Sequence, residues 1–217
     1  MQIIWHGHSC FQIITSLAKD SPVSLVIDPF SESSGIRLPA VSGDAVLVTH
    51  NHEDHNNWQA VKGNPFLIDG PGEYEIKNVY IQGIPAFHDN NLGKEKGQVT
   101  IYTITSEDIR ICHLSDLGQK ELFAEQIEDI GEIDILFLPV GGTFTIDSQE
   151  AARIVNQIEP RIVIPMHYQS PKLGKELDPV EKFLKVMGQK SVETLPKLTI
   201  KQKDLPQEGP KIILLKP

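Results

Sequence analysis

Three histidines and an aspartate lie within six consecutive positions of this chain: His50, His52, Asp54 and His55, directly after the apolar run 45–48. Imidazole nitrogen and carboxylate oxygen are ligands of zinc and its first-row neighbours, which bind several such groups converging from different directions. A strand points successive side chains to opposite faces, whereas a loop that leaves a strand can direct all of them at one point. The pattern therefore predicts a buried strand followed by a metal-binding loop. The alternative is a histidine-rich surface turn.

Composition indicates the class of protein to which this loop belongs. The chain has 217 residues and a mass of 24.2 kDa, with 40% hydrophobic and 23% charged residues, which predicts one globular domain over residues 1–217. We find no apolar run as long as a membrane span and no export signal. Cys10 and Cys112 lie in apolar segments without the spacing of a metal finger, so we expect buried thiols. These features predict a cytoplasmic protein that does not associate with membranes.

The net charge indicates the kind of partner. A formal charge of −9 disfavours a broad grip on nucleic acid, which requires basic surface. Two bound divalent ions would leave the chain acidic. The charge therefore favours a small-molecule substrate.

Strand-like segments dominate the first half of the chain. Several of them are β-branched runs bounded by Gly, Pro, Asp or Ser, at residues 3–6, 10–14, 24–27, 45–48, 79–84, 99–105 and 109–113. Residues 106–108 read as a hairpin turn between the last two. Further strands are predicted at 134–138, 161–164, 194–200 and 212–215.

Helices are predicted in the second half, at 121–130, from Asp147 to Pro160, and at 179–187. Asp147 and Glu150 have the spacing of a capping box, which marks the start of the second helix. With its flanking strands this helix forms a strand–helix–strand crossover. The whole pattern predicts two β-rich halves with helices outside.

Three isolated residues complete a candidate metal site. His88, Asp116 and His167 each follow an apolar strand-like run, so we expect them along one rim of stacked sheets. His113 competes with His88 for its position. A lone histidine is more often a buried or surface residue than a ligand, and the argument depends on the joint pattern with the loop at 50–55.

Taken in chain order, from His50 to His167, the candidate residues resemble the metal-binding residues of the metallo-β-lactamase fold superfamily of dinuclear metallohydrolases. The match extends over about residues 3–168 and includes Asp28 as the early aspartate of that superfamily. More narrowly, Trp5-x-Gly7-His8-Ser9 and Pro165-Met166-His167-Tyr168 resemble the branch containing bacterial ascorbate-6-phosphate lactonase and N-acyl-phosphatidylethanolamine-hydrolysing phospholipase D. The resemblance implies an α+β fold, a four-layer αβ/βα sandwich of two packed mixed β-sheets with helices outside.

The resemblance also implies two divalent metal ions, with zinc expected first and manganese or iron as alternatives. One ion would be held by His50, His52 and His88, and the other by Asp54, His55 and His167. Asp116 would bridge both with its two carboxylate oxygens. Asp54 and Asp116 are the implied catalytic residues, acting with a metal-bridging hydroxide on a small phosphoester or lactone.

Residues around the implied ligands have less certain roles. Asp28 is expected to fix a ligand imidazole, or to be a strand-end turn residue. His8 is expected near the site without being a ligand. His113 is either a general acid or a partly buried strand residue. Gly141 and Gly142 either present backbone N–H groups to an anion or form a tight turn.

Alternative functions remain open within this fold, which hosts many chemistries. Asp116 stands where zinc β-lactamases have a cysteine, which argues against β-lactamase activity. A nuclease or cyclic-nucleotide phosphodiesterase is the alternative enzyme. A metal-binding scaffold or sensor is the non-enzymatic alternative, although the complete ligand set favours catalysis.

Overall fold

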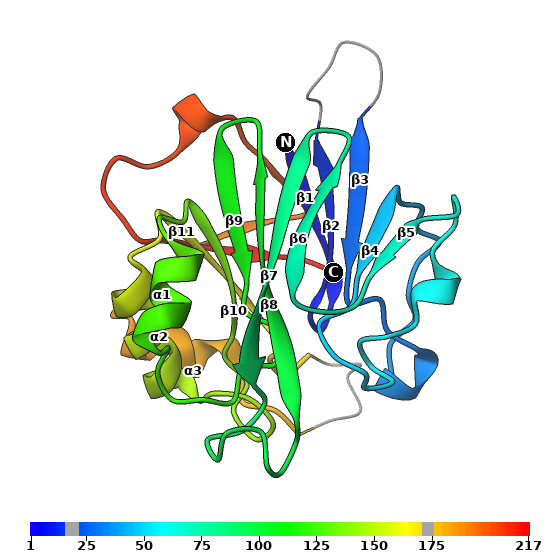
Figure 1. Ribbon diagram of the computed structural model, residues 1–217. Coiled ribbons are helices and arrows are strands. Elements are labelled where there is room, and N and C mark those ends of the chain that lie inside the picture. The colour runs from blue at the N-terminus through cyan, green and yellow to red at the C-terminus, as the bar shows by residue number, and fades with distance from the viewer. Residues whose placement is uncertain (16–21, 171–175) are drawn as a thin grey trace.

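Two β-sheets packed against each other form the centre of the protein (Figure 1). The computed structural model describes residues 1–15, 22–170 and 176–217. One sheet contains six strands and the other eight. This arrangement confirms the predicted pair of mixed sheets.

The six-stranded sheet is formed mainly by the first third of the chain. Its strands, in spatial order, are β13 (Leu198–Thr199), β1 (Gln2–Gly7), β2 (Cys10–Thr15), β3 (Val23–Ile27), β4 (Ala45–Leu47) and β5 (Phe66–Ile68). The strands β1, β2 and β3 pair antiparallel, whereas β3, β4 and β5 pair parallel. Parallel neighbours end at the same edge of a sheet, so the carboxyl ends of β3 and β4 lie together.

The eight-stranded sheet is formed by the remainder of the chain. Its strands, in spatial order, are β12 (Glu193–Leu195), β14 (Lys211–Leu215), β11 (Ile162–Met166), β10 (Ile135–Pro139), β9 (Ile109–His113), β8 (Gln98–Ser106), β7 (Val79–Phe87) and β6 (Gly72–Ile76). The neighbours β6–β7, β7–β8 and β8–β9 pair antiparallel. The neighbours β9–β10, β10–β11 and β11–β14 pair parallel. The hairpin turn predicted at 106–108 joins β8 and β9.

Alternating side chains fill the space between the two sheets. On β1 and β2 the buried residues Ile3, Trp5, Phe11 and Ile13 point into this layer, as expected for strands with one face in a core. Phe11 stacks on Phe137 of the other sheet with the ring centroids 4.0 Å apart. This contact joins the two sheets.

Helices cover the outer face of the eight-stranded sheet (Figure 1). They are α1 (Ala124–Ile130), α2 (Ser148–Ile158) and α3 (Val180–Val186). The predicted capping box at the start of α2 is present, because the Asp147 carboxylate accepts from the N–H groups of Gln149 and Glu150 and Glu150 accepts from the Asp147 N–H. The crossover β10–α2–β11 joins parallel strands as predicted.

The outer face of the six-stranded sheet has a different cover. Buried Cys10, Val26 and Val46 pack there against Phe30 and Val61. The covering residues belong to the connections after β3 and β4, which contain the 3-10 turns η1 (Glu32–Ser34) and η2 (Trp58–Ala60). Over the described residues this outer layer therefore lacks an α-helix, unlike the layer over the other sheet.

Several predicted elements differ from the observed ones in their end residues, and two of these differences have a clear physical cause. The strand predicted at 194–200 is two strands in different sheets, because Pro196 has no N–H for a ladder and the chain crosses there from β12 to β13. The helix predicted from residue 121 starts at Ala124, since the N–H groups of Leu122 and Phe123 bond to side chains of Gln157 and Gln126. The strands β5 and β6 were not predicted. None of the described helices has the length and apolar character needed to span a membrane.

Candidate metal centre

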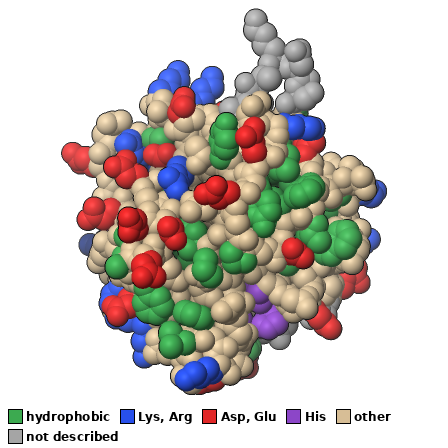
Figure 2. Space-filling view, viewed as in Figure 1, with side chains coloured by type: hydrophobic (Ala, Val, Ile, Leu, Met, Phe, Trp, Pro, Cys, Tyr) green, Lys and Arg blue, Asp and Glu red, His purple; other side chains and the backbone are tan. Residues whose placement is uncertain are grey.

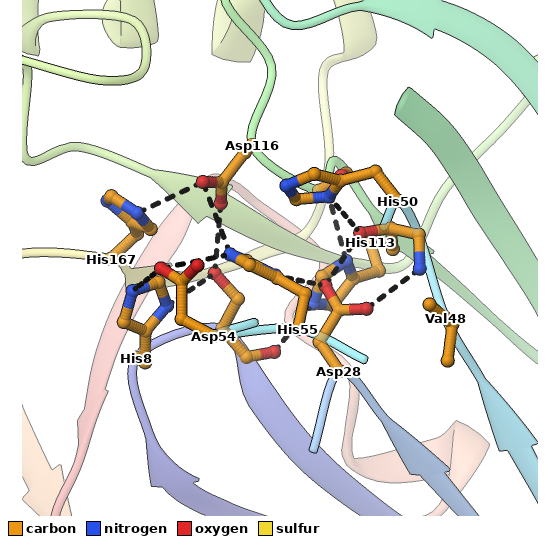
Figure 3. A network of polar contacts seen from close by, with 12 residues as sticks. His8, Asp28, Val48, His50, Asp54, His55, His113, Asp116 and His167 are labelled. Atoms are coloured by element: carbon orange, nitrogen blue, oxygen red, sulfur yellow. Dashed lines mark hydrogen bonds and ion pairs between the residues drawn. The ribbon is translucent and has the colours of Figure 1, made fainter. Parts of the chain in front are cut away.

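Every predicted ligand follows the carboxyl end of a strand. The loop with His50 to His55 follows β4, and His88, Asp116 and His167 follow β7, β9 and β11. These strand ends lie on one rim of the two sheets, and Figure 3 shows five of the predicted ligand side chains converging there, those of His50, Asp54, His55, Asp116 and His167. The structure thus brings together residues up to 117 positions apart, His50 and His167.

One group contains three imidazoles. The donor atoms of His50, His52 and His88 lie within 4.8 Å of one another, and their ring centroids are 4.5 to 5.2 Å apart. His52 is the exposed member, whereas His50 and His88 are buried. Because His52 is exposed, this group is open to solvent. Histidine side chains reach the surface in the lower right part of the face in Figure 2.

A second group surrounds the carboxylate of Asp116. Its Oδ2 lies 3.3 Å from His55 Nε2 and 3.1 Å from His167 Nε2, and also 3.8 Å from Nε2 of His88 in the first group. Its Oδ1 instead accepts a hydrogen bond of 3.3 Å from Ser9 Oγ. The resemblance implies that Asp116 bridges two ions, and its Oδ2 lies close to histidines of both groups. Asp54 Oδ2 lies 3.7 Å from His55 Nε2.

The buried histidine nitrogens make this site suitable for binding metal ions. Within the described ranges, buried ring nitrogens without a hydrogen-bond partner include Nε2 of His50, His55 and His167. A buried polar atom without a partner is unfavourable by about 1–3 kcal/mol. Several such atoms directed at common points, with a carboxylate between them, match the donor set of a pair of divalent cations.

The electrostatics of the site keep His50 and His88 neutral and favour positive charge beside Asp116. Burial lowers the pKa of His50 to about 2 and that of His88 to about 4. Burial alone would also lower the pKa of His55, but the carboxylates of Asp116 and Asp28 raise it well above its ordinary value. The Asp116 pKa lies well below its usual range, because His167 and His55 outweigh the effect of burial. A cation beside Asp116 is therefore favourable.

Asp28 and Thr49 orient two of the histidines. The Asp28 carboxylate accepts from Thr49 N–H (2.8 Å), Thr49 Oγ1–H (2.7 Å) and His55 Nδ1–H (2.9 Å). Because the Thr49 hydroxyl proton goes to Asp28, its oxygen accepts from His50 Nδ1–H at 3.0 Å. Because Nδ1 of each ring donates to these oxygens, Nε2 is the nitrogen of each ring that can bind a cation. Asp28 also ends β3 with a φ of 46°, so both roles expected for it are combined.

The role of Thr49 was missed by the sequence analysis. Its position supplied a signal, because a hydroxyl residue directly before the first histidine of the loop can reach an acceptor on the neighbouring strand end.

His113 also differs from one of its expected roles. Its Nδ1 accepts from Ser115 N–H at 3.0 Å and its Nε2–H donates to Ser9 O at 2.9 Å. Both ring nitrogens bond to backbone, which favours the buried structural role over that of a general acid.

Two glycines allow the ligand-bearing segments to pack closely. A Cβ at Gly118 would lie 2.1 Å from the carbonyl oxygen of His88, and one at Gly141 would lie 2.0 Å from that of His167. Gly142 has a φ of 59°, and its N–H donates to Ile146 O at 3.2 Å. This geometry supports the turn interpretation of the two adjacent glycines rather than anion binding.

Gly141→Ala is expected to lower the free energy of unfolding by about 3 kcal/mol or more, because the new Cβ collides with backbone that cannot move independently. The same collision should displace His167 and weaken metal binding. Denaturant unfolding and metal titration measure the two effects. Gly70→Ala is the matched control, since its Cβ meets no atom within 4 Å. Equal stability of the two variants would contradict this interpretation.

Comparisons with known proteins agree with the fold and the site. The β-lactamase superfamily domain model matches residues 2–167. A UPF0173 protein of Pyrococcus furiosus is 31% identical over 220 residues, which cover 91% of this chain and 95% of that protein. A UPF0173 metal-dependent hydrolase of Bacillus cytotoxicus is 30% identical over 78% of this chain and 86% of its own length.

A solved structure gives the same result. A candidate Zn-dependent hydrolase of the metallo-β-lactamase superfamily from Thermotoga maritima is 36% identical, with a TM-score of 0.79 over 99% of this chain and 97% of that chain. The superfamily predicted from the ligand motif is confirmed. The chain therefore belongs to the metallo-β-lactamase superfamily and, within it, to the UPF0173 family, whose members include proteins named metal-dependent hydrolases.

Proposed function

We propose that this protein is a dinuclear metal-dependent hydrolase that acts on a small phosphoester or lactone. The observation that carries the proposal is the position of Asp116 Oδ2, within 3.8 Å of imidazole nitrogens from both histidine groups. The seven proposed metal ligands are His50, His52, Asp54, His55, His88, Asp116 and His167. Zinc is the first candidate, with manganese and iron as alternatives.

The side chains have distinct parts in the proposed reaction. Two divalent ions, when bound, lower the pKa of a shared water and polarise a substrate oxygen. Asp116 supplies negative charge between the two histidine groups. Asp54, at the partly exposed side of the site, accepts a hydrogen bond from the attacking water and orients it. Asp28 keeps His55 in the tautomer that can bind a cation.

The substrate class follows from the site and the surface together. A carboxylate rather than a thiolate at position 116 suits phosphoester or lactone hydrolysis, and the charge of −9 disfavours polynucleotides. Cys10 and Cys112 are buried free thiols, which supports the cytoplasm as the proposed location. Because residues of both sheets pack in one core, we propose a single domain.

Metal analysis combined with an activity screen tests this function. Purified protein should contain close to two ions per chain, and removal of the ions by a chelator should abolish hydrolysis until zinc, manganese or iron is restored. The screen compares small phosphoesters and lactones with RNA, DNA and cyclic nucleotides. Turnover restricted to the nucleic-acid arm would favour a nuclease or cyclic-nucleotide phosphodiesterase. Loaded protein that is silent throughout, while binding a protein partner stoichiometrically, would favour a scaffold.

A further inference from the structure

His8 lies inside the second histidine group, although it is distant in sequence from the other members. It stands in the turn between β1 and β2, and its ring packs edge-on against those of His55 and His167, with centroids 4.9 and 4.3 Å away. Donor atoms of these three histidines lie within 4.8 Å of one another. All three side chains are buried. Figure 3 shows His8 directly beside Asp54.

His8 has a backbone conformation that is unfavourable for most residues other than glycine. Its φ is 54°, in the left-handed region that non-glycine residues seldom adopt. The carbonyl oxygen of His8 accepts from Trp5 Nε1–H at 3.0 Å and from His167 N–H at 3.1 Å. These two hydrogen bonds explain the motif Trp5-x-Gly7-His8-Ser9. The Trp5 indole and the His167 backbone fix the turn that directs the His8 imidazole into the site.

The hydrogen positions around His8 leave two acceptors facing each other. The Ser9 hydroxyl donates its only proton to Asp116 Oδ1 at 3.3 Å, so it can only accept from His8 Nδ1–H, 3.4 Å away. His8 Nε2 then carries a lone pair. That lone pair lies 3.1 Å from the carboxylate oxygen Oδ2 of Asp54. Two acceptors this close repel each other unless a proton or a metal cation lies between them.

We propose that His8 is a further ligand of the second metal position, where it joins Asp54, His55 and His167 around a divalent cation. This inference rests on the proposed dinuclear function. With Asp116, the second position then has five protein donors, whereas the first has three histidines and Asp116. Five protein donors and a water suit a six-coordinate ion such as manganese or iron, rather than four-coordinate zinc. The two positions therefore differ in the metal they prefer.

The competing interpretation gives His8 the opposite tautomer. Its Nε2–H would then donate to Asp54, and His8 would only hold that carboxylate in place. His8→Gln separates the two roles, because a glutamine amide can still donate to Asp54 but is a poor ligand for a first-row ion. His6→Gln is the matched control, since His6 lies in β1 two positions before His8 and bonds to Gln12 outside the site.

We expect His8→Gln to weaken binding of the second metal equivalent by at least about 100-fold, the upper end of the effect of residues that only support a ligand. Chelator competition measures this loss. The visible bands of cobalt-substituted protein should intensify as the coordination number falls. His6→Gln should leave both measurements unchanged. Circular dichroism verifies that each variant is folded.

A second measurement does not depend on a variant. In the unaltered protein loaded with cadmium and isotope-labelled histidine, NMR should show coupling between the metal and Nε2 of His8. Absence of this coupling, or unchanged affinity and cobalt bands in His8→Gln, would overturn the ligand role while leaving the dinuclear hydrolase intact. Failure of the unaltered protein to bind a second ion would instead refute the proposed function, and the inference with it.

Discussion

Asp116→Asn is expected to abolish hydrolysis and to cost the protein at least one of its metal ions. Asparagine keeps the shape of the side chain but removes the negative charge that lies within 3.8 Å of His55, His88 and His167. Asp116 thus supplies negative charge to imidazoles of both groups. The loss of activity should therefore exceed the roughly 10- to 100-fold effect of residues that only touch a ligand.

Initial rates and metal content of the purified variant measure both effects. Asp129→Asn is the control for removal of a carboxylate, since Asp129 is an exposed residue of α1. A fully active Asp116→Asn protein would refute the proposed mechanism, even if its metal content were lower. An inactive variant that keeps two ions would leave Asp116 with a role in the reaction but not in metal retention.

The positions of the candidate ligands were predictable because they obey a local rule. His88, Asp116 and His167 each follow a strand whose composition is visible in the sequence, and strand ends on one rim of packed sheets lie close together. The capping box of α2 is equally local, since Asp147 and Glu150 are three positions apart. Such features depend only on neighbouring residues and on the alternation of buried side chains.

The supporting residues were not predictable in the same way, because their roles depend on contacts between distant segments. Gly118 matters only because the carbonyl of His88 passes over it. Ser9 contacts Asp116, 107 positions away. No periodicity or spacing in the sequence records these distances. The same reason explains why His8 was expected near the site but not assigned as a ligand.

The short strands show a further limit of sequence patterns. The strand β5 has three residues, and β6 alternates partly buried with exposed residues, so neither gives a long apolar run. Their positions are fixed by pairing, β5 with β4 and β6 with β7. The segment after residue 193 has strand-like composition, yet Pro196 divides it between two sheets. Pairing partners therefore decide these elements, and composition does not.

Asp28→Ala should lower both the stability of the metal-free protein and its affinity for metal. The substitution leaves three buried donors without an acceptor, namely Thr49 N–H, Thr49 Oγ1–H and His55 Nδ1–H. Each buried unpaired donor is unfavourable by about 1–3 kcal/mol, so the free energy of unfolding should fall by about 3 kcal/mol or more. Metal affinity should fall by about 10- to 100-fold, because His55 loses the hydrogen bond that fixes its tautomer and the Thr49 hydroxyl that orients His50 loses its acceptor.

Thr49→Val separates the two parts of this network. It removes the hydroxyl between Asp28 and His50 but leaves the bond from His55 to Asp28. We therefore expect weaker binding at the first metal position, little change at the second, and a smaller loss of stability than in Asp28→Ala. Denaturant unfolding of the metal-free variants and titration with each ion measure these effects. Equal weakening of both positions by Thr49→Val would show that the two histidine groups respond as one unit, contrary to the separate hydrogen bonds that orient His50 and His55.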